Sequence, residues 1–124
     1  MNSKTILIVD DEADLTSLMR GVLETAGYRA LVAINPAEAL EAWNAHKQEI
    51  DVVLMDIHLV RRLGALDLAQ RMQAEVPAVK FVYSSSHAPA VFGNPALVEG
   101  RNFLQKPFGP AELLDIIANQ FPPG

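Results

Sequence analysis

Acidic side chains that could bind a cation or a phosphoryl group follow two apolar runs in this sequence. Asp56 closes the stretch Asp51–Asp56, which holds four apolar residues between two acids, and Asp10 and Asp11 follow the apolar run Thr5–Val9. Short apolar runs of this kind are typical of strands buried on both faces of a parallel sheet. A carboxylate just past the carboxyl end of such a strand lies where open α/β sheets bind ligands.

A hydroxyl and a lysine follow two further predicted strands. Ser84 comes directly after Val79–Tyr83, and Lys106 comes directly after Asn102–Gln105. Because adjacent parallel strands lie about 4.8 Å apart, we expect both side chains to converge with the acids. Clustered carboxylates repel one another, and a hard divalent cation such as Mg²⁺ relieves that repulsion. With a lysine and a hydroxyl, the group suits phosphoryl transfer or a carboxylate acting as nucleophile.

Helical and extended patterns alternate along the chain, which predicts a parallel sheet with helices on both faces. Strands are predicted over 5–9, 28–33, 51–56, 79–83 and 102–105, and helices over 14–25, from Pro36 with Asn35 as N-cap, over 65–75 and over 110–121. The first helix would carry Leu15, Leu18, Met19, Val22 and Leu23 at helical spacing, and the second would turn Ala39, Leu40 and Trp43 inward.

The stretch between Ser86 and Phe103 breaks this alternation. A helix is expected there, but the stretch contains Pro89, Gly93, Pro95 and Gly100. A proline in a helix interior costs about 3 kcal/mol. We therefore predict a loop, or at most one or two helical turns.

Length and composition favour a single acidic domain over residues 1–124. Half of the 124 residues are hydrophobic and the net charge is −5, which favours a real core and argues against non-specific binding to nucleic acid. The chain has no cysteine, which excludes disulfides, thiolate zinc sites and cysteine nucleophiles. No signal peptide and no run of membrane-spanning length are recognisable, so a reducing, cytoplasmic setting without a membrane partner is expected.

Taken in order and spacing, the motifs resemble a response regulator receiver domain over essentially the whole chain. They are Ile6–Glu12 with its acidic pair, the Asp56 strand with Gly64 eight residues on, Ser84, and Phe103–Phe108. The segment Val79–Ser86 and the loop-like stretch after it are most similar to receivers attached to hybrid histidine kinases.

This resemblance implies a flavodoxin-like three-layer α/β sandwich with five parallel strands in the order 2-1-3-4-5, in which the family's fourth helix is short or replaced by a loop. It implies a phosphoacceptor in a two-component phosphorelay rather than a conventional enzyme, since such a domain promotes only its own phosphorylation and dephosphorylation. Its partners would be a histidine kinase or a histidine phosphotransfer domain, an unnamed output protein and a second copy in a homodimer.

The resemblance also implies the role of each site residue. Asp56 would accept the phosphoryl group. Asp11, Asp56 and the backbone carbonyl of His58 would bind Mg²⁺, or Mn²⁺ in its place, while Asp10 would act through a metal-bound water. Lys106 would pair with the phosphoryl group.

Two further residues would form the switch. Ser84 would swing to donate a hydrogen bond to the phosphoryl group, and Phe103 would move inward behind it, a two-state response to one new dianion. The Lys106-Pro107 bond is often cis in this family.

Departures from the family pattern lie close to Asp56 and Ser84. Val60 stands where the family often has proline, and Arg61-Arg62 follows it in a loop that borders the site. His58 and Ser86 occupy positions that tune the lifetime of the phosphoryl group in the family.

Other functions compete with this one. A pseudo-receiver would be an interaction module that is never phosphorylated. A phosphatase resembling the haloacid dehalogenases would use Asp56 as nucleophile, but His58 replaces the second acid of that motif. A flavodoxin-like flavin binder needs a phosphate loop after the first strand, where Asp10, Asp11 and Glu12 would repel a phosphate.

Simpler interpretations also apply to single residues. Asp10 and Asp11 could cap a helix, Ser84 could lie in an ordinary turn, and Phe103 could be plain core. Packing roles are expected for Trp43 and Tyr28, and solvated positions for His46 and His87. His58 by itself does not indicate a transition-metal site.

Overall fold

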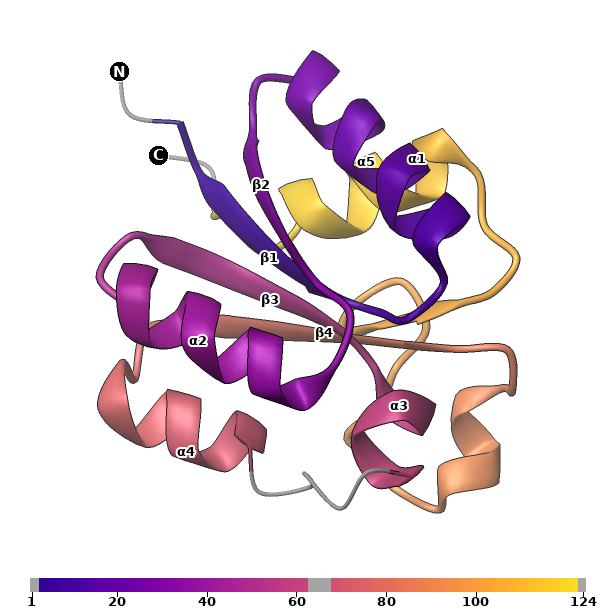
Figure 1. Ribbon diagram of the computed structural model, residues 1–124. Coiled ribbons are helices and arrows are strands. Elements are labelled where there is room, and N and C mark those ends of the chain that lie inside the picture. Colours follow the sequence, from indigo (N-terminus) through magenta and orange to yellow (C-terminus); the bar gives the residue numbers. More distant parts are fainter. Residues whose placement is uncertain (1–2, 63–67, 123–124) are drawn as a thin grey trace.

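A parallel β-sheet lies between two layers of helices (Figure 1). The computed structural model describes residues 3–62 and 68–122. Within this part of the chain the strands are β1 (Thr5–Val9), β2 (Arg29–Ala33), β3 (Ile50–Asp56), β4 (Lys80–Ser85) and β5 (Phe103–Gln105). The sheet has five strands in the order β2-β1-β3-β4-β5, all paired in parallel, which confirms the expected fold.

Helices cover both faces of the sheet. They are α1 (Ala13–Thr25), α2 (Pro36–His46), α3 (Ile57–Arg62), α4 (Leu68–Glu75) and α5 (Pro110–Ala118), with the short 3₁₀ helix η1 at Pro89–Phe92. Figure 1 shows α1 and α5 on one side of the sheet and α2 and α4 on the other. Each pair of helices encloses its own half of the core, because side chains alternate between the two faces along every strand.

The α2 helix begins as the sequence predicts. Asn35 Oδ1 accepts a hydrogen bond from the backbone N–H of Glu38 at 2.8 Å, and Pro36 occupies the first turn, where its missing N–H costs nothing. Trp43 on this helix is fully buried, and its indole N–H donates to Glu75 Oε1 at 2.9 Å. The expected packing role of Trp43 is thereby confirmed.

The apolar stripe of α1 is narrower than the sequence pattern indicates. Met19 and Leu23 are buried against the sheet, whereas Leu18 is 58% exposed. Leu18 lies on the helix flank that faces Pro110 and Leu114, where it lines a shallow apolar surface pocket. The spacing of apolar residues indicates which side of a helix is apolar, but the neighbouring elements determine how much of that side is buried.

The connection between β4 and β5 contains no α-helix in the described residues. It forms η1 followed by turns, and Gly93 and Gly100 have φ angles of 62° and 82°. These left-handed conformations are strained for residues with a side chain. The predicted loop with one or two turns is confirmed.

The segment after Asp56 is helical rather than the expected loop. Asp56 Oδ1 accepts backbone N–H bonds from His58 at 2.8 Å and Leu59 at 3.2 Å, which caps the first turn of α3. With valine rather than proline at position 60, every residue of this turn keeps the N–H that a helix uses. Gly64 and the beginning of the helix predicted over 65–75 lie outside the described residues.

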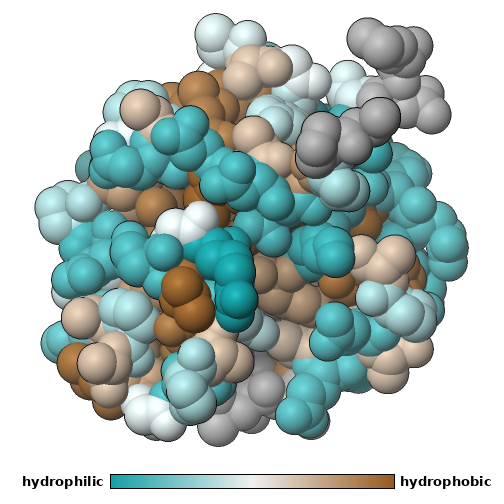
Figure 2. Space-filling view, turned by 180° about the vertical axis from the view of Figure 1, so that it is seen from behind, coloured by the Kyte–Doolittle hydropathy of each residue, from teal (hydrophilic) through white to brown (hydrophobic). Residues whose placement is uncertain are grey.

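The surface is mixed in character. Figure 2 shows one face on which hydrophobic residues are scattered among hydrophilic ones. In the described ranges 3–62 and 68–122, every helix is too short or too polar to cross a membrane.

Candidate functional site

Three carboxylates meet at the carboxyl ends of β1 and β3. Val9 pairs with Met55 in the parallel register, so the residues that follow them, Asp10 and Asp56, lie side by side. Together with Asp11 they offer carboxylate oxygens that all lie within 4.8 Å of one another. Asp10 and Asp56 are buried and Asp11 is exposed, so the cluster opens to solvent on one side. The structure thus brings together the acids that the sequence singled out.

Lys106 reaches across the end of the sheet into this cluster. Its Nζ lies 2.7 Å from Asp56 Oδ2 and 2.8 Å from Asp10 Oδ2. Glu12 Oε1 lies 2.8 Å from the same ammonium group. The contact of Glu12 was not predicted; its only signal in the sequence is that it is the third acid of the run that begins at Asp10. The Lys106-Pro107 peptide bond is cis, as expected.

The electrostatics of the cluster follow from burial and contact. Burial raises the pKa of the Asp10 carboxyl above its usual value, and Lys106 and the backbone N–H of Glu12 counteract only part of that rise. Burial by itself lowers the pKa of Lys106, but its close contacts with the carboxylates of Asp10, Asp56 and Glu12 outweigh this effect and raise the pKa above its ordinary value. Lys106 is therefore a permanent cation, whereas burial disfavours the charged form of Asp10.

One of the two carboxylate oxygens of Asp10 lacks a hydrogen bond. Oδ1 accepts the backbone N–H of Glu12 at 2.9 Å, while the buried Oδ2 has the Lys106 ion pair but no hydrogen bond of good geometry. Carboxylate oxygens grouped in this way are the hard donors that Mg²⁺ prefers. Asp10, Asp11 and Asp56 are therefore the residues that could hold a divalent metal ion. The additional ligand expected from the His58 carbonyl stays a prediction.

Both oxygens of Asp56 are engaged. Oδ1 caps α3 through the N–H groups of His58 and Leu59, and Oδ2 contacts Lys106. The side chain is 9% exposed, so these contacts hold it in one orientation at the edge of solvent. A group joined to this carboxylate would lie beside a cation and the first turn of a helix.

Ser84 and Phe103 lie on the strands beside Asp56. Ser84 pairs with Asp56 in the register of β3 and β4, and its buried hydroxyl makes only a long contact, 3.5 Å, to the carbonyl of Met55. Phe103 is fully buried, with its ring centroid 6.0 Å from that of Phe92. The hydroxyl is thus weakly held, and an inward movement of Phe103 stays a prediction.

The histidines agree only in part with the sequence-based expectation: His87 is solvated as predicted, whereas His46 is half-buried. His58 and His87 are both exposed, but their ring centroids lie 5.6 Å apart, so neither is alone. His46 is one-third exposed, and its Nδ1 lies 3.8 Å from Glu49. The expected packing role of Tyr28 is confirmed, since its ring stacks on Phe121 with centroids 6.4 Å apart.

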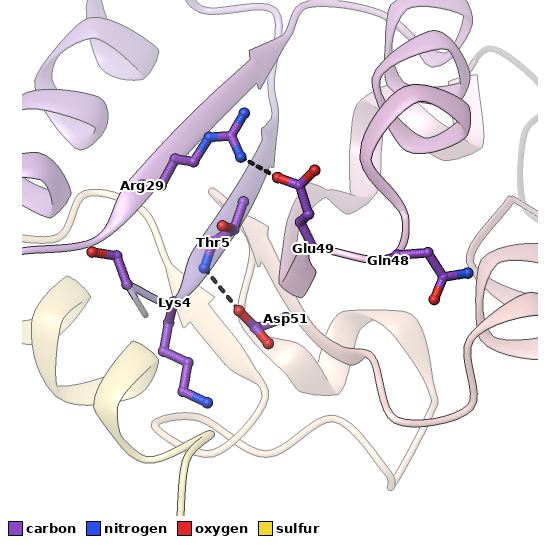
Figure 3. A pocket seen from close by; sticks show the side chains of 7 residues that line it. Lys4, Thr5, Arg29, Gln48, Glu49 and Asp51 are labelled. Carbon is purple, nitrogen blue, oxygen red and sulfur yellow. Dashed lines mark hydrogen bonds and ion pairs between the residues drawn. The ribbon is translucent and has the colours of Figure 1, made fainter. Parts of the chain in front are cut away.

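A second polar pocket lies at the opposite end of the sheet. Figure 3 shows Arg29 pointing toward Glu49, and Asp51 Oδ2 accepting the backbone N–H of Thr5 at 2.8 Å. Lys4 lies over the ring of Phe121, with its ammonium 5.2 Å from the centroid. The charges around this pocket neutralise one another, whereas the acids at the other end of the strands converge on one point.

Comparison with known proteins agrees with this geometry. The family model described as the response regulator receiver domain matches residues 6–118. The chain is 35% identical over 113 residues to the nitrogen assimilation regulatory protein NtrX of Azorhizobium caulinodans, covering 90% of this chain and 24% of that protein. It is 31% identical over 110 residues to the transcriptional regulatory protein CpxR of Escherichia coli, covering 88% of this chain and 45% of that protein.

Solved structures show the same fold. A response regulator from Thermotoga maritima superposes with a TM-score of 0.79 at 24% identity, covering 96% of this chain and 98% of that chain. A CheY-like receiver domain protein from Methanospirillum hungatei superposes with a TM-score of 0.77 at 25% identity, covering 96% and 94%.

The two sequence relatives also bear on the expected similarity to receivers attached to hybrid histidine kinases. They are named as regulators of nitrogen assimilation and of transcription, so they do not support a special similarity to receivers of hybrid histidine kinases. The chain spans less than half the length of either relative. The family match itself covers nearly all of the sequence, and the fold and the cluster of acids agree with it. This chain belongs to the response regulator receiver domain family of two-component signalling.

Proposed function

We propose that this chain is the phosphoacceptor of a two-component phosphorelay and that Asp56 receives the phosphoryl group. The observation that carries the proposal is the Lys106 ammonium at 2.7 Å from Asp56 Oδ2, inside a cluster of acids that fits a divalent cation. We take residues 1–124 as one receiver domain.

The donor in this proposal is a phosphohistidine of a histidine kinase or a histidine phosphotransfer domain. An oxygen of Asp56 forms the new bond to phosphorus, the bond between phosphorus and the donor imidazole breaks, and the imidazole leaves as the neutral ring once protonated. A recess of about 330 Å³ adjoins the site and is lined by Glu12, Leu15, Ser86, Lys106, Pro107 and Phe108. In this proposal the donor imidazole enters the recess and approaches Lys106 from there.

Each side chain of the site has a role in this step. Lys106 stays protonated and lies where negative charge develops on the phosphoryl oxygens. Asp11 and Asp56, with the His58 carbonyl, would hold Mg²⁺ directly and Asp10 would hold it through water. When bound, the ion supplies positive charge that neutralises the phosphoryl oxygens.

The output of the domain follows from the new dianion. Ser84 has only a long contact to a carbonyl, so its hydroxyl is available to turn toward a phosphoryl group on Asp56. We propose that this turn is coupled to Phe103 and changes the affinity of the domain for its partners. NtrX and CpxR are much longer than the matched stretch, so only the receiver step is carried over from them.

Mass spectrometry of the intact chain tests the proposal. Incubation with acetyl phosphate and Mg²⁺ should add one phosphoryl group, which a chelator or Asp56→Asn should abolish. Asp51→Asn is a matched control, because Asp51 lies at the other end of the same strand and should leave the adduct intact. If neither the adduct nor beryllofluoride binding is seen in the folded, Mg²⁺-loaded protein, the chain is a pseudo-receiver. Steady hydrolysis of a small phosphate ester would instead support a phosphatase.

A further inference from the structure

We propose that His58 and His87 form a second metal site, selective for a borderline divalent ion such as Zn²⁺. The two imidazoles come from segments that follow adjacent strands, β3 and β4, and their ring centroids lie 5.6 Å apart at an interplanar angle of 57°. The inference does not depend on phosphorylation of Asp56.

The spacing of the rings fits one shared ion. With a zinc–nitrogen distance of about 2.0–2.1 Å, an ion lies about 3.2 Å from the centroid of the imidazole that binds it. Two imidazoles on one tetrahedral ion then have centroids about 5.2 Å apart. The observed 5.6 Å is within a few tenths of an ångström of that value, so the separation of the rings matches that of two imidazoles on one ion.

Both histidines are held by hydrogen bonds of their backbone N–H groups. The N–H of His58 donates to Asp56 Oδ1 at 2.8 Å, and the N–H of His87 donates to Ser85 Oγ at 3.0 Å. Ser85 is buried, so the start of the His87 loop is anchored to the sheet. The two exposed rings are thus presented side by side from fixed main-chain positions, which reduces the ordering cost of chelation.

The chemistry of the pair differs from that of the neighbouring acids. Imidazole nitrogen suits Zn²⁺, Cu²⁺ and Ni²⁺, whereas Mg²⁺ prefers oxygen. The net charge of −5 favours the approach of cations to the molecule. Two protein ligands leave the remaining coordination positions to water, so the site is open rather than structural.

The test is a Zn²⁺ titration of the whole chain at slightly alkaline pH, followed by calorimetry and by NMR of the imidazole rings. The chain has three histidines, and His46 is the matched control because it lies at the end of α2. We expect one Zn²⁺ per chain, with ring signals of His58 and His87 shifted and that of His46 unchanged. His58→Gln and His87→Gln should each weaken binding by at least about tenfold, and His46→Gln should not.

A further variant separates this site from the acidic cluster. Asp56→Asn should change Zn²⁺ affinity far less than either histidine variant does. The proposal is overturned if both histidine variants bind Zn²⁺ like the parent chain, if His46→Gln weakens binding equally, or if no ring signal responds. Fluorescence of the single, buried Trp43 verifies that each variant is folded.

Discussion

Lys106 Nζ lies 2.7 Å from Asp56 Oδ2 although 50 positions separate the two residues in the chain. The contact links the end of β5 to the end of β3, across the intervening strand β4. The same ammonium also touches Asp10 and Glu12, so one cation compensates three carboxylates.

Replacing Lys106 by methionine should destabilise the domain when divalent ions are absent. The variant leaves the buried acids without their cation, and breaking a buried ion pair from one side costs about 3–5 kcal/mol. Since Asp56 and Lys106 keep some contact with water, we expect a loss of about 2–4 kcal/mol. Urea unfolding followed by Trp43 fluorescence measures it, and Mg²⁺ should restore part of the loss.

Lys47→Met is the matched control for this experiment. Lys47 pairs with Glu75 on the exposed surface at 3.2 Å, and such pairs contribute little. Equal destabilisation by the two variants would contradict a special role for Lys106.

Asp10→Asn should stabilise the metal-free protein at neutral pH. Burial raises the pKa of Asp10, so the folded state holds the proton more tightly than the unfolded state does. The unfavourable contribution of Asp10 is therefore absent below its ordinary pKa, grows as pH rises from that value to the raised pKa, and is constant above the raised pKa. Thermal unfolding across this pH range should show the advantage of the variant shrinking as pH falls.

In the presence of Mg²⁺, the parent chain should be more stable than Asp10→Asn. The parent chain should gain about 1.4 kcal/mol when free Mg²⁺ is ten times its dissociation constant, and Asp10→Asn should gain less. The Mg²⁺ affinity of the parent chain, but not of Asp10→Asn, should also weaken as pH falls toward the pKa of Asp10, because a protonated carboxyl is a poor ligand. Identical Mg²⁺ responses in the two proteins would remove Asp10 from the metal site.

Ser84→Ala should slow phosphorylation more than it affects folding. The hydroxyl makes only a 3.5 Å contact, so its loss should change stability by less than about 1 kcal/mol. Loss of a donor to the developing charge should slow phosphoryl transfer from acetyl phosphate by roughly tenfold to a hundredfold. Ser84→Thr keeps the hydroxyl and should recover most of the rate; a slow threonine variant would point to packing instead.

Two glycine-to-alanine changes should have opposite signs. Gly100 has a φ of 82°, so Gly100→Ala should cost about 1 kcal/mol or more. Gly21 is an exposed residue inside α1 with no atom within 4 Å of an added Cβ, so Gly21→Ala should stabilise by about 0.5–1 kcal/mol. Chemical denaturation of both variants checks this, and a stable Gly100→Ala would argue against the turn that replaces the helix between β4 and β5.

The sequence alone determined the sheet and the residues at its carboxyl edge. Buried parallel strands are continuous apolar runs, and the polar residue that ends each run is visible as a break in it. Asp10, Asp56 and Lys106 could be assigned to one edge for this reason. The proline and glycine residues between Ser86 and Phe103 likewise exclude a long helix, and the structure has only a short 3₁₀ helix and turns there.

Only the tertiary structure decided which side chains touch across that edge. The bond from Lys106 to Glu12 and the pairing of His58 with His87 join segments distant in sequence, and no local pattern encodes the rotamers that bring them together. The helix after Asp56 depends on capping by the Asp56 carboxylate. The sequence pattern predicts a phosphoacceptor role for this carboxylate but not a capping role. Periodicity follows from local backbone geometry, whereas these contacts depend on how the strands are ordered and how their ends are packed.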